Sequence, residues 1–466
     1  MHQFSRLLRV WTPVSRVFQE FFRVLPRAFR VLPLFFVCFT TAHAQSLSFI
    51  RDAEIEATLK RMSTPIFQAA GISPDSIKIF MVNDRSLNAF VVGRNMVFHT
   101  GLMEKLESPN ELYGVIAHET AHIAGGHALL RSNAASSARG PLILGTILGI
   151  AAAAAGQGGV GGAIIAGSQT VAQRNILKYT RGQESSADQA AIGYLESVRV
   201  DPSGMVRTLE RLKAVEIVSI GNRDPYTRTH PLTTQRIKLL QQRVARSSSR
   251  NAIMNSDIAY WHSRMRAKLR GFLGDPLRVL RQVPASDRSE NATLMRAVAY
   301  HRSPDLPAAI READKLLVMR PNDPYYHELK GQFLFESGDA RGAVASYQRA
   351  VTLAPDEPLL QVAYGRALLA MGDEGSVRRA REALLSATRA DRLDSSGWRQ
   401  LATAESRLGN ELNATLATAE FQALQGSLKA AERNAKRVQQ LAPTGSPSWL
   451  RADDLIAAVE RGLKER

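Results

Sequence analysis

Apolar residues in the first half of the chain follow two periods, one typical of helices and one typical of strands. Helical spacing predicts helices over three ranges, residues 49–70, 111–129 and 203–218. Alternating, β-branched and aromatic runs predict three strands, over residues 78–82, 89–92 and 96–99. Gly93-Arg94-Asn95 is predicted as the turn between the last two strands. The pattern therefore indicates a small β-sheet that precedes the helix over residues 111–129.

In the second half of the chain, glycine, proline and alanine recur at a fixed distance. Gly331 and Gly365 are 34 residues apart, and three inserted residues then lengthen the period to 37, so that Ala343 recurs as Ala380. A period of 34 with small residues at helix–helix contacts is typical of tetratricopeptide repeats. We expect about four such units stacked as a solenoid, preceded by helices over residues 253–272 and 275–283.

The first 44 residues differ from the rest of the chain. They contain six arginines and one acidic residue, followed by the apolar run 31–39 and then Thr41-Ala42-His43-Ala44. This order is typical of a signal peptide, so we expect export and cleavage after Ala44. An uncleaved membrane anchor is the alternative, although the run is short for a bilayer. Cys38, the one cysteine, falls in this segment, so the exported chain would have no disulfide.

The helix predicted over residues 111–129 contains His118-Glu119-Thr120-Ala121-His122. His118 and His122 are four residues apart, so their imidazoles lie on one face of a helix and can bind one tetrahedral Zn²⁺ ion. Glu119 is an anion one step round the helix, where it can act as general base toward a water at the metal. Two histidines on a solvated helix face are the alternative.

A zinc site needs a third protein ligand, and one candidate follows the motif directly. The extended form of the motif places a histidine at position 128, but this residue is Ala128. His127 lies five residues after His122, which is about 140° round a helix. We therefore expect His127 to face away from the metal and to hydrogen-bond a neighbour.

The second candidate lies on a helix that opens at Gln183 and has an apolar face made of Ala187, Ala190, Ala191 and Leu195. Glu184 is predicted as the third zinc ligand. Asp188, one turn later, is predicted to hold a zinc-bound histidine through its other nitrogen. A solvated pair of acidic residues is the alternative for a pattern this short.

These motifs, together with Asn88-Ala89-Phe90, resemble those of the HtpX and CAAX-prenyl-protease superfamily of zinc endopeptidases. The succession of signal peptide, protease and repeats is similar to that of the periplasmic beta-barrel assembly-enhancing proteases. The resemblance implies one Zn²⁺ per chain in a gluzincin-type site, where a glutamate such as Glu184 supplies the third ligand. It also implies that a strand edge beside the zinc binds the substrate backbone, a role that would fall to Asn88, Ala89 and Phe90. A turn role for Asn88 and a core role for Phe90 are the alternative.

We therefore expect a mainly α-helical chain in four parts. These are a signal peptide (1–44), a zincin-type α+β metalloprotease domain with a small β-sheet (45–250), a helical linker (251–290) and an α-solenoid of tetratricopeptide repeats (291–466). The Ser- and Arg-rich residues 245–250 are predicted to form a linker.

Two further stretches of the protease part have several interpretations. His230 precedes Pro231 just before a basic helix, where similar peptidases carry a His-Pro pair. It could donate to the oxyanion, occupy the fourth position of the zinc, or be a surface histidine without a role. Arg236, on that helix, could pair with an acidic residue near the site. The mostly apolar residues 141–167 could form a lid, a membrane contact or buried core.

Lysine and arginine outnumber aspartate and glutamate by 60 to 43, which gives a formal net charge of +17. No nucleic-acid-binding signature accompanies this charge, so an anionic membrane surface is the simpler partner. The resemblance implies a periplasmic zinc endopeptidase that cleaves misfolded or stalled proteins in outer-membrane protein quality control. Its repeats would bind substrate or the outer-membrane assembly machinery. The alternatives are a chaperone-like scaffold with an autoinhibited or vestigial protease site, and a membrane-embedded relative with membrane substrates.

Overall fold

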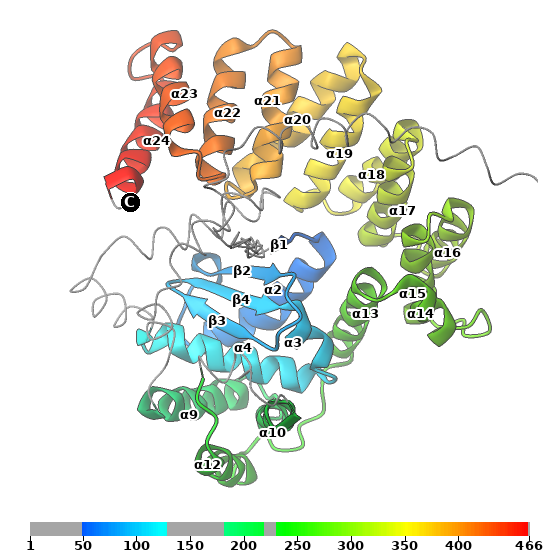
Figure 1. Cartoon of the computed structure of the whole chain (residues 1–466), viewed down its shortest axis with the longest axis vertical. Coiled ribbons are helices and arrows are strands. Elements are labelled where there is room, and N and C mark those ends of the chain that lie inside the picture. Colours follow the sequence, from blue (N-terminus) through cyan, green and yellow to red (C-terminus); the bar gives the residue numbers. More distant parts are fainter. Residues whose placement is uncertain (1–48, 128–180, 219–229, 465–466) are drawn as a thin grey trace, which may run out of the picture. The chain divides into compact units, whose positions relative to one another are not determined.

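The computed structural model describes residues 49–127, 181–218 and 230–464 of the chain (Figure 1). The predicted signal peptide with Cys38 and the apolar residues 141–167 lie outside these described residues. The described part is mainly helical and contains one four-stranded sheet. The predicted fold class, a small α+β unit followed by helical repeats, is confirmed.

The sheet lies near the start of the described chain and has the strand order β1-β2-β4-β3. Its strands are β1 (Phe49–Ile50), β2 (Lys78–Val82), β3 (Ala89–Val92) and β4 (Asn95–His99). β2 and β4 are parallel, and β1 and β3 pair antiparallel with them at the two edges. Because side chains alternate along a strand, Met81 and Phe98 lie in the main core, whereas Val82 and Val97 form a smaller cluster on the other face.

The helices of this half pack on the sheet or on one another. They are α2 (Ala53–Ala69), α3 (Thr100–Lys105), α4 (Pro109–Ala124), α9 (Arg181–Ser197), α10 (Ser203–Val218) and α12 (Thr234–Ala245), with a short 3-10 helix, η2 (Pro74–Ser76). α2, α3 and α4 contact the strands themselves. α4 contacts β3 on one side and α2, α9 and α10 on others, so it runs through the centre of this half (Figure 1). Leu59, Leu112, Leu195 and Leu240, each from a different helix, share one buried core.

Two helices of the first half differ from the prediction by four residues or more at one end. The helix expected over residues 49–70 begins at Ala53, because Phe49 and Ile50 form β1 and the Asp52 carboxylate accepts a hydrogen bond from the Ile55 N–H as a helix cap. The helix expected over residues 111–129 spans Pro109–Ala124. Gly126, with φ of +65°, turns the chain away after its end.

α13 (Ser256–Leu273) packs against both halves of the chain. Ile258, Met265 and Leu269 lie in the core of the first half, whereas Ala267 lies in the core of the first repeats. The short helix α14 (Pro276–Gln282) follows it. The residues expected to form a linker at 245–250 are held against α9, because Ser247 Oγ donates a hydrogen bond of 2.6 Å to the Glu196 carboxylate on that helix.

Buried charges reinforce the position of α13. Arg264 is fully buried, and its Nε lies 2.6 Å from Glu54 Oε1 on α2. The other side of the same guanidinium binds Asp323, which caps α17. Lys268, one turn later, places its Nζ 2.7 Å from Asp52, 3.4 Å from Glu54 and 3.7 Å from Glu328. One helix thus joins α2 to the repeats through paired charges.

The repeats occupy residues 290–464, which the structure describes without a gap. Ten helices pack there as five successive pairs. They are α15 (Glu290–Arg302), α16 (Leu306–Met319), α17 (Pro324–Glu336), α18 (Ala340–Leu353), α19 (Pro358–Met371), α20 (Glu374–Ala390), α21 (Ser395–Arg407), α22 (Glu411–Leu424), α23 (Leu428–Leu441) and α24 (Pro447–Lys464). The expected number of about four units was too low, because terminal repeats depart from the periodic residues.

Small residues in the repeats lie where paired helices approach each other. A Cβ atom on Gly331 of α17 would come within 2.9 Å of the Tyr347 ring on α18. A Cβ atom on Gly365 of α19 would come within 2.6 Å of Leu384 Cγ on α20. The 34-residue recurrence of glycine therefore reflects steric contact within each pair.

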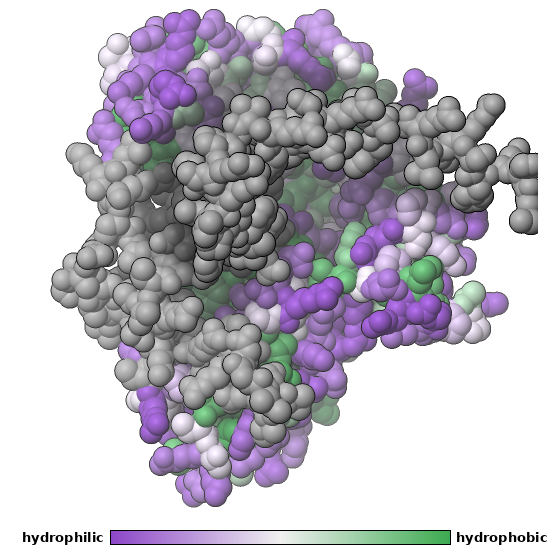
Figure 2. Space-filling view, viewed as in Figure 1, coloured by the Kyte–Doolittle hydropathy of each residue, from purple (hydrophilic) through white to green (hydrophobic). Residues whose placement is uncertain are grey.

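Hydrophilic residues dominate the described surface on the face shown in Figure 2, and hydrophobic residues are scattered between them. Among the described helices, none combines the length and apolar character that crossing a membrane requires.

Candidate metal centre

α4 brings three of the predicted site residues into the core of the first half. His118, Glu119 and His122 are all buried, and both histidines face α9. Glu184 on α9 and His230, which precedes α12, are buried in the same place. One possible ligand atom from each of His118, His122, Glu184 and His230 lies within 4.8 Å of the others.

The distances between these atoms are nearly equal. His118 Nε2 lies 3.1 Å from His122 Nε2 and 3.3 Å from His230 Nδ1. The Glu184 carboxylate lies 3.5 Å from His118 Nε2, 3.3 Å from His122 Nε2 and 3.1 Å from His230 Nδ1. Bonds of about 2.0–2.1 Å to a tetrahedral ion place ligand atoms about 3.3–3.4 Å apart. The donor set therefore fits one such ion.

The tautomers of the two histidines support the same conclusion. His118 Nδ1 lies 3.0 Å from Asp188 Oδ1. A carboxylate only accepts hydrogen bonds, so Nδ1 carries the proton and a neutral His118 has its lone pair on Nε2. His122 Nδ1 lies 2.9 Å from His127 Nδ1. If His122 donates the proton of this hydrogen bond, its Nε2 carries a lone pair, and this lone pair points at the Nε2 lone pair of His118. A cation between the two nitrogens makes this arrangement favourable.

Arg236 on α12 holds the two carboxylates of α9. Its Nε and Nη2 lie 2.7 Å and 2.8 Å from the two oxygens of Asp188, and its Nη1 binds Glu184. Such a forked contact fixes both the position and the plane of a carboxylate. The pair of acidic residues is buried rather than solvated, which removes the alternative given for it.

The charges at the site shift the pKa values in opposite directions. Burial lowers the pKa of His122 to about 2, so this histidine is neutral, as a ligand must be. Burial disfavours charge on His118 as well, but the carboxylates of Asp188 and Glu184 outweigh it and raise its pKa to about 10, so an ion that bound Nε2 would displace a proton from this histidine. Burial opposes ionisation of Glu184, whereas its electrostatic interactions with His230 and with the Arg236 guanidinium hold its pKa well below the usual range.

Glu119 and His230 face each other beside the donor set. His230 Nε2 lies 3.5 Å from Glu119 Oε1, and both residues are fully buried. His230 is therefore not a surface histidine, and that alternative is wrong. The two other roles given for it stay predictions.

His127 lies in a position that helical geometry did not predict. It does hydrogen-bond a neighbour, but this neighbour is His122, and the two rings lie 5.1 Å apart. It is not among the possible ligand atoms, as expected, but the helical position assumed for it is wrong, because the helix ends at Ala124 and the chain then folds back. The glycine pair at 125–126 was the sequence signal for this turn.

The stretch 88–90 lies at the free edge of the sheet. β3 pairs with β4 on one side, and its other side is not paired with any described strand. Asn88 is 5% exposed, and its Oδ1 has no hydrogen-bond partner among the described residues. Phe90 is half-buried and packs edge-on against His99 at 5.9 Å, outside the main core.

Comparison with known proteins agrees with this geometry. The model of the family described as Peptidase family M48 matches residues 50–244. This range contains every residue placed at the site above. The match to this peptidase family, together with the buried donor set, makes this chain a metalloprotease.

Proteins similar to the whole chain, repeats included, are named proteases. The chain is 28% identical to the beta-barrel assembly-enhancing protease of Yersinia pestis over 404 residues, which cover 83% of this chain and 79% of that protein. It is 26% identical to the beta-barrel assembly-enhancing protease of Escherichia coli (strain K12) over 430 residues, or 90% of this chain and 86% of that protein. Metalloprotease YcaL of the same strain matches over 177 residues at 28% identity, which cover 37% of this chain and 63% of that protein.

Proposed function

We propose that this chain is a zinc-dependent endopeptidase that hydrolyses peptide bonds of misfolded or stalled proteins. The buried cluster in which Glu119 lies beside imidazole nitrogens and one carboxylate is the observation that supports this most directly. Zinc in hydrolases is typically bound by three protein ligands of these types, with a further position for water or substrate. His118, His122 and Glu184 would be the three ligands.

The residues of this chain would divide the reaction between them. A bound zinc ion would supply Lewis acidity to the scissile carbonyl and to the attacking water. The carboxylate of Glu119 would accept a proton from that water and then deliver it to the leaving amine. Asp188, through His118 Nδ1, and Arg236, through Glu184, would keep two ligands in position.

Replacement of Glu119 by glutamine tests this proposal. E119Q removes the proton acceptor but keeps the size of the side chain, so we expect at least a 10²-fold loss of kcat on an unfolded model protein. Zinc content and melting temperature should stay close to those of the parent. E107Q, at an exposed glutamate just before the same helix, is the matched control. Equal cleavage by E119Q and the parent would exclude the mechanism.

We further propose that His230 holds the enzyme in a resting state. Its Nδ1 lies among the donor atoms, where water or substrate would have to bind, and its Nε2 faces the general base. H230A should therefore cleave an unfolded protein faster than the parent, measured as initial rate. H327A, at a histidine of α17 whose Nε2 contacts a backbone carbonyl, is the control. A loss of activity instead would assign His230 to the oxyanion.

The free edge of β3 is the proposed binding site for the substrate backbone. An extended peptide added to this edge would gain main-chain hydrogen bonds without requiring one sequence, which suits an enzyme for misfolded proteins. The unpaired Oδ1 of Asn88 would then accept one further hydrogen bond from the peptide. Ala89 and Phe90 would supply the adjoining backbone.

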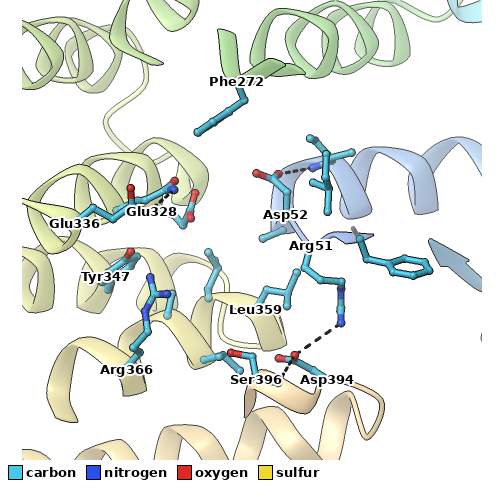
Figure 3. Close-up of a pocket in the computed structure, with 18 of the residues that line it drawn as sticks. Arg51, Asp52, Phe272, Glu328, Glu336, Tyr347, Leu359, Arg366, Asp394 and Ser396 are labelled. Carbon is cyan, nitrogen blue, oxygen red and sulfur yellow. Dashed lines mark hydrogen bonds and ion pairs between the residues drawn. The ribbon is translucent and has the colours of Figure 1, made fainter. Parts of the chain in front are cut away.

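The repeats are proposed to bind a segment of the substrate or a partner protein. A pocket of about 470 Å³ has Arg51 and Asp52, before α2, among its lining residues. In Figure 3 these two residues face the repeat helices. The walls of the pocket combine apolar residues such as Leu359 with charged ones, of which Glu328 and Arg366 are examples. Such mixed lining suits a peptide segment.

The biological role we propose is quality control during outer-membrane protein assembly in the periplasm. It is supported by the names of the similar proteases and by the basic and apolar segments of a signal peptide at residues 1–44. A chaperone-like scaffold is the second candidate, because the repeats make up much of the chain. An E119Q variant that restores assembly in a strain lacking the gene would favour the scaffold. Release from membranes by salt alone would indicate peripheral contact and exclude a membrane-embedded relative.

A further inference from the structure

The two histidines of α4 have different partners behind them. His118 Nδ1 faces the Asp188 carboxylate at 3.0 Å, whereas His122 Nδ1 faces the imidazole of His127 at 2.9 Å. Metal-bound histidines generally donate their second N–H to a carboxylate, a carbonyl or water, and this partner fixes the ring and its tautomer. Another histidine in that place is unusual.

The chain builds a specific turn to bring His127 there. α4 ends at Ala124, and Gly126 takes a φ of +65°, which side chains rarely allow. A Cβ atom on Gly125 would lie 2.8 Å from His127 Nε2 and 3.0 Å from its Cε1. The absence of side chains at 125 and 126 is thus what lets the ring fold back onto His122.

We propose that His127 is a positioning residue of the metal site, an inference that rests on the proposed zinc-dependent function. His127 Nδ1 accepts the Nδ1–H of His122, which keeps the lone pair on His122 Nε2 and holds the ring toward Glu184. A neutral acceptor achieves this without a further buried negative charge beside Glu184 and Asp188.

Zinc affinity of the full exported chain, measured by competition with a chelator, tests the proposal. H127N places an oxygen acceptor near the position of Nδ1, whereas H127F keeps a ring and removes both nitrogens. Loss of such a partner typically weakens metal binding 10–100-fold, so we expect this loss for H127F and much less for H127N. G125A should behave as H127F does, because its Cβ occupies the space of the ring. H327F is the control for a histidine far from the site.

The pattern across the variants decides the outcome. Equal weakening in H127N and H127F would overturn the proposal in favour of simple packing, and unchanged affinity in H127F would overturn it as well. Should H127F fail to fold, the comparison of G125A with H127N gives the same decision. A parent protein that binds no zinc would instead overturn the proposed function, whereas unchanged variants of a zinc-binding, active parent would remove only the role of His127.

Discussion

At the scale of single residues, Arg236 places a positive charge against the two buried carboxylates of the site. Its guanidinium is 7% exposed and contacts both Glu184 and Asp188, which are themselves buried. Removing one partner of a buried ion pair leaves an uncompensated charge and is more costly than never having had the pair. Without the arginine, the two buried carboxylates would lose the positive charge that pairs with them.

R236M keeps most of the side-chain length and removes the charge. We expect a loss of about 3–5 kcal/mol in the free energy of unfolding, measured by urea denaturation after chelation. With zinc present the loss should be smaller, because the ion replaces part of the missing positive charge. R243M, on the same helix, loses a hydrogen bond to the Ser185 carbonyl and should cost well under half as much. Equal losses for the two variants would contradict the role assigned to Arg236.

Residue types and spacing were enough to predict the chemistry of His118, Glu119 and His122, since four residues make about one helical turn. They also indicated Glu184 and Asp188 as a pair, and the structure places both at the cluster. The contacts of Arg236 could be predicted only as a guess, because no local pattern links α12 to α9. His127 was misplaced because the helix was extrapolated past its glycines.

At the scale of elements, the repeats show why their period is visible in the sequence. Glycine recurs where a side chain would collide with the partner helix. Because this steric conflict arises once per repeat, glycine recurs in the sequence with the period of the repeat. The β1 strand shows the opposite case. Its two residues are too few for any alternation to be seen, so they were assigned to the following helix.

G331A tests the contact between α17 and α18. Alanine favours helices by about 1 kcal/mol over glycine, but its methyl group would press on the rigid Tyr347 ring, and overpacking costs about 1–3 kcal/mol. We expect a net loss of up to about 2 kcal/mol, seen as a lower melting temperature. G193A in α9, where a Cβ meets no atom within 4 Å, should be neutral or stabilising. A stabilised G331A would show that the ring yields easily.

At the scale of the whole molecule, the charges around Lys268 tie α2 to the repeats. Glu328 is the acidic residue of this group that lies farthest from the lysine, at 3.7 Å. Burial, with the negative charges of Asp52 and Glu54, outweighs the attraction of Lys268 and raises the pKa of Glu328 to about 7. The folded chain thus retains a proton that the unfolded chain releases near pH 4.5.

Stability should therefore fall as the pH rises from about 4.5 through about 7, because the folded state binds the extra proton. E328Q mimics the protonated form. It should match the parent near pH 4, below the unfolded pKa, and exceed it at pH 8 by about 1–2 kcal/mol in unfolding free energy. E336Q on the same helix is the control, since the hydrogen bond from His301 lowers the pKa of Glu336. Identical parent and E328Q curves at both pH values would contradict this.

The position of α13 limits how the gene can be divided. A fragment that stops near residue 250 would uncover the apolar surface on which Ile258, Met265 and Leu269 rest, and would strip Glu54 of its two cations. A repeat fragment that starts near residue 291 would lose the opposite side of the same helix. Peptidase and repeats therefore share one helix that both need for their cores, and a soluble truncation would have to carry α13 together with a substitute for whatever the discarded half had covered.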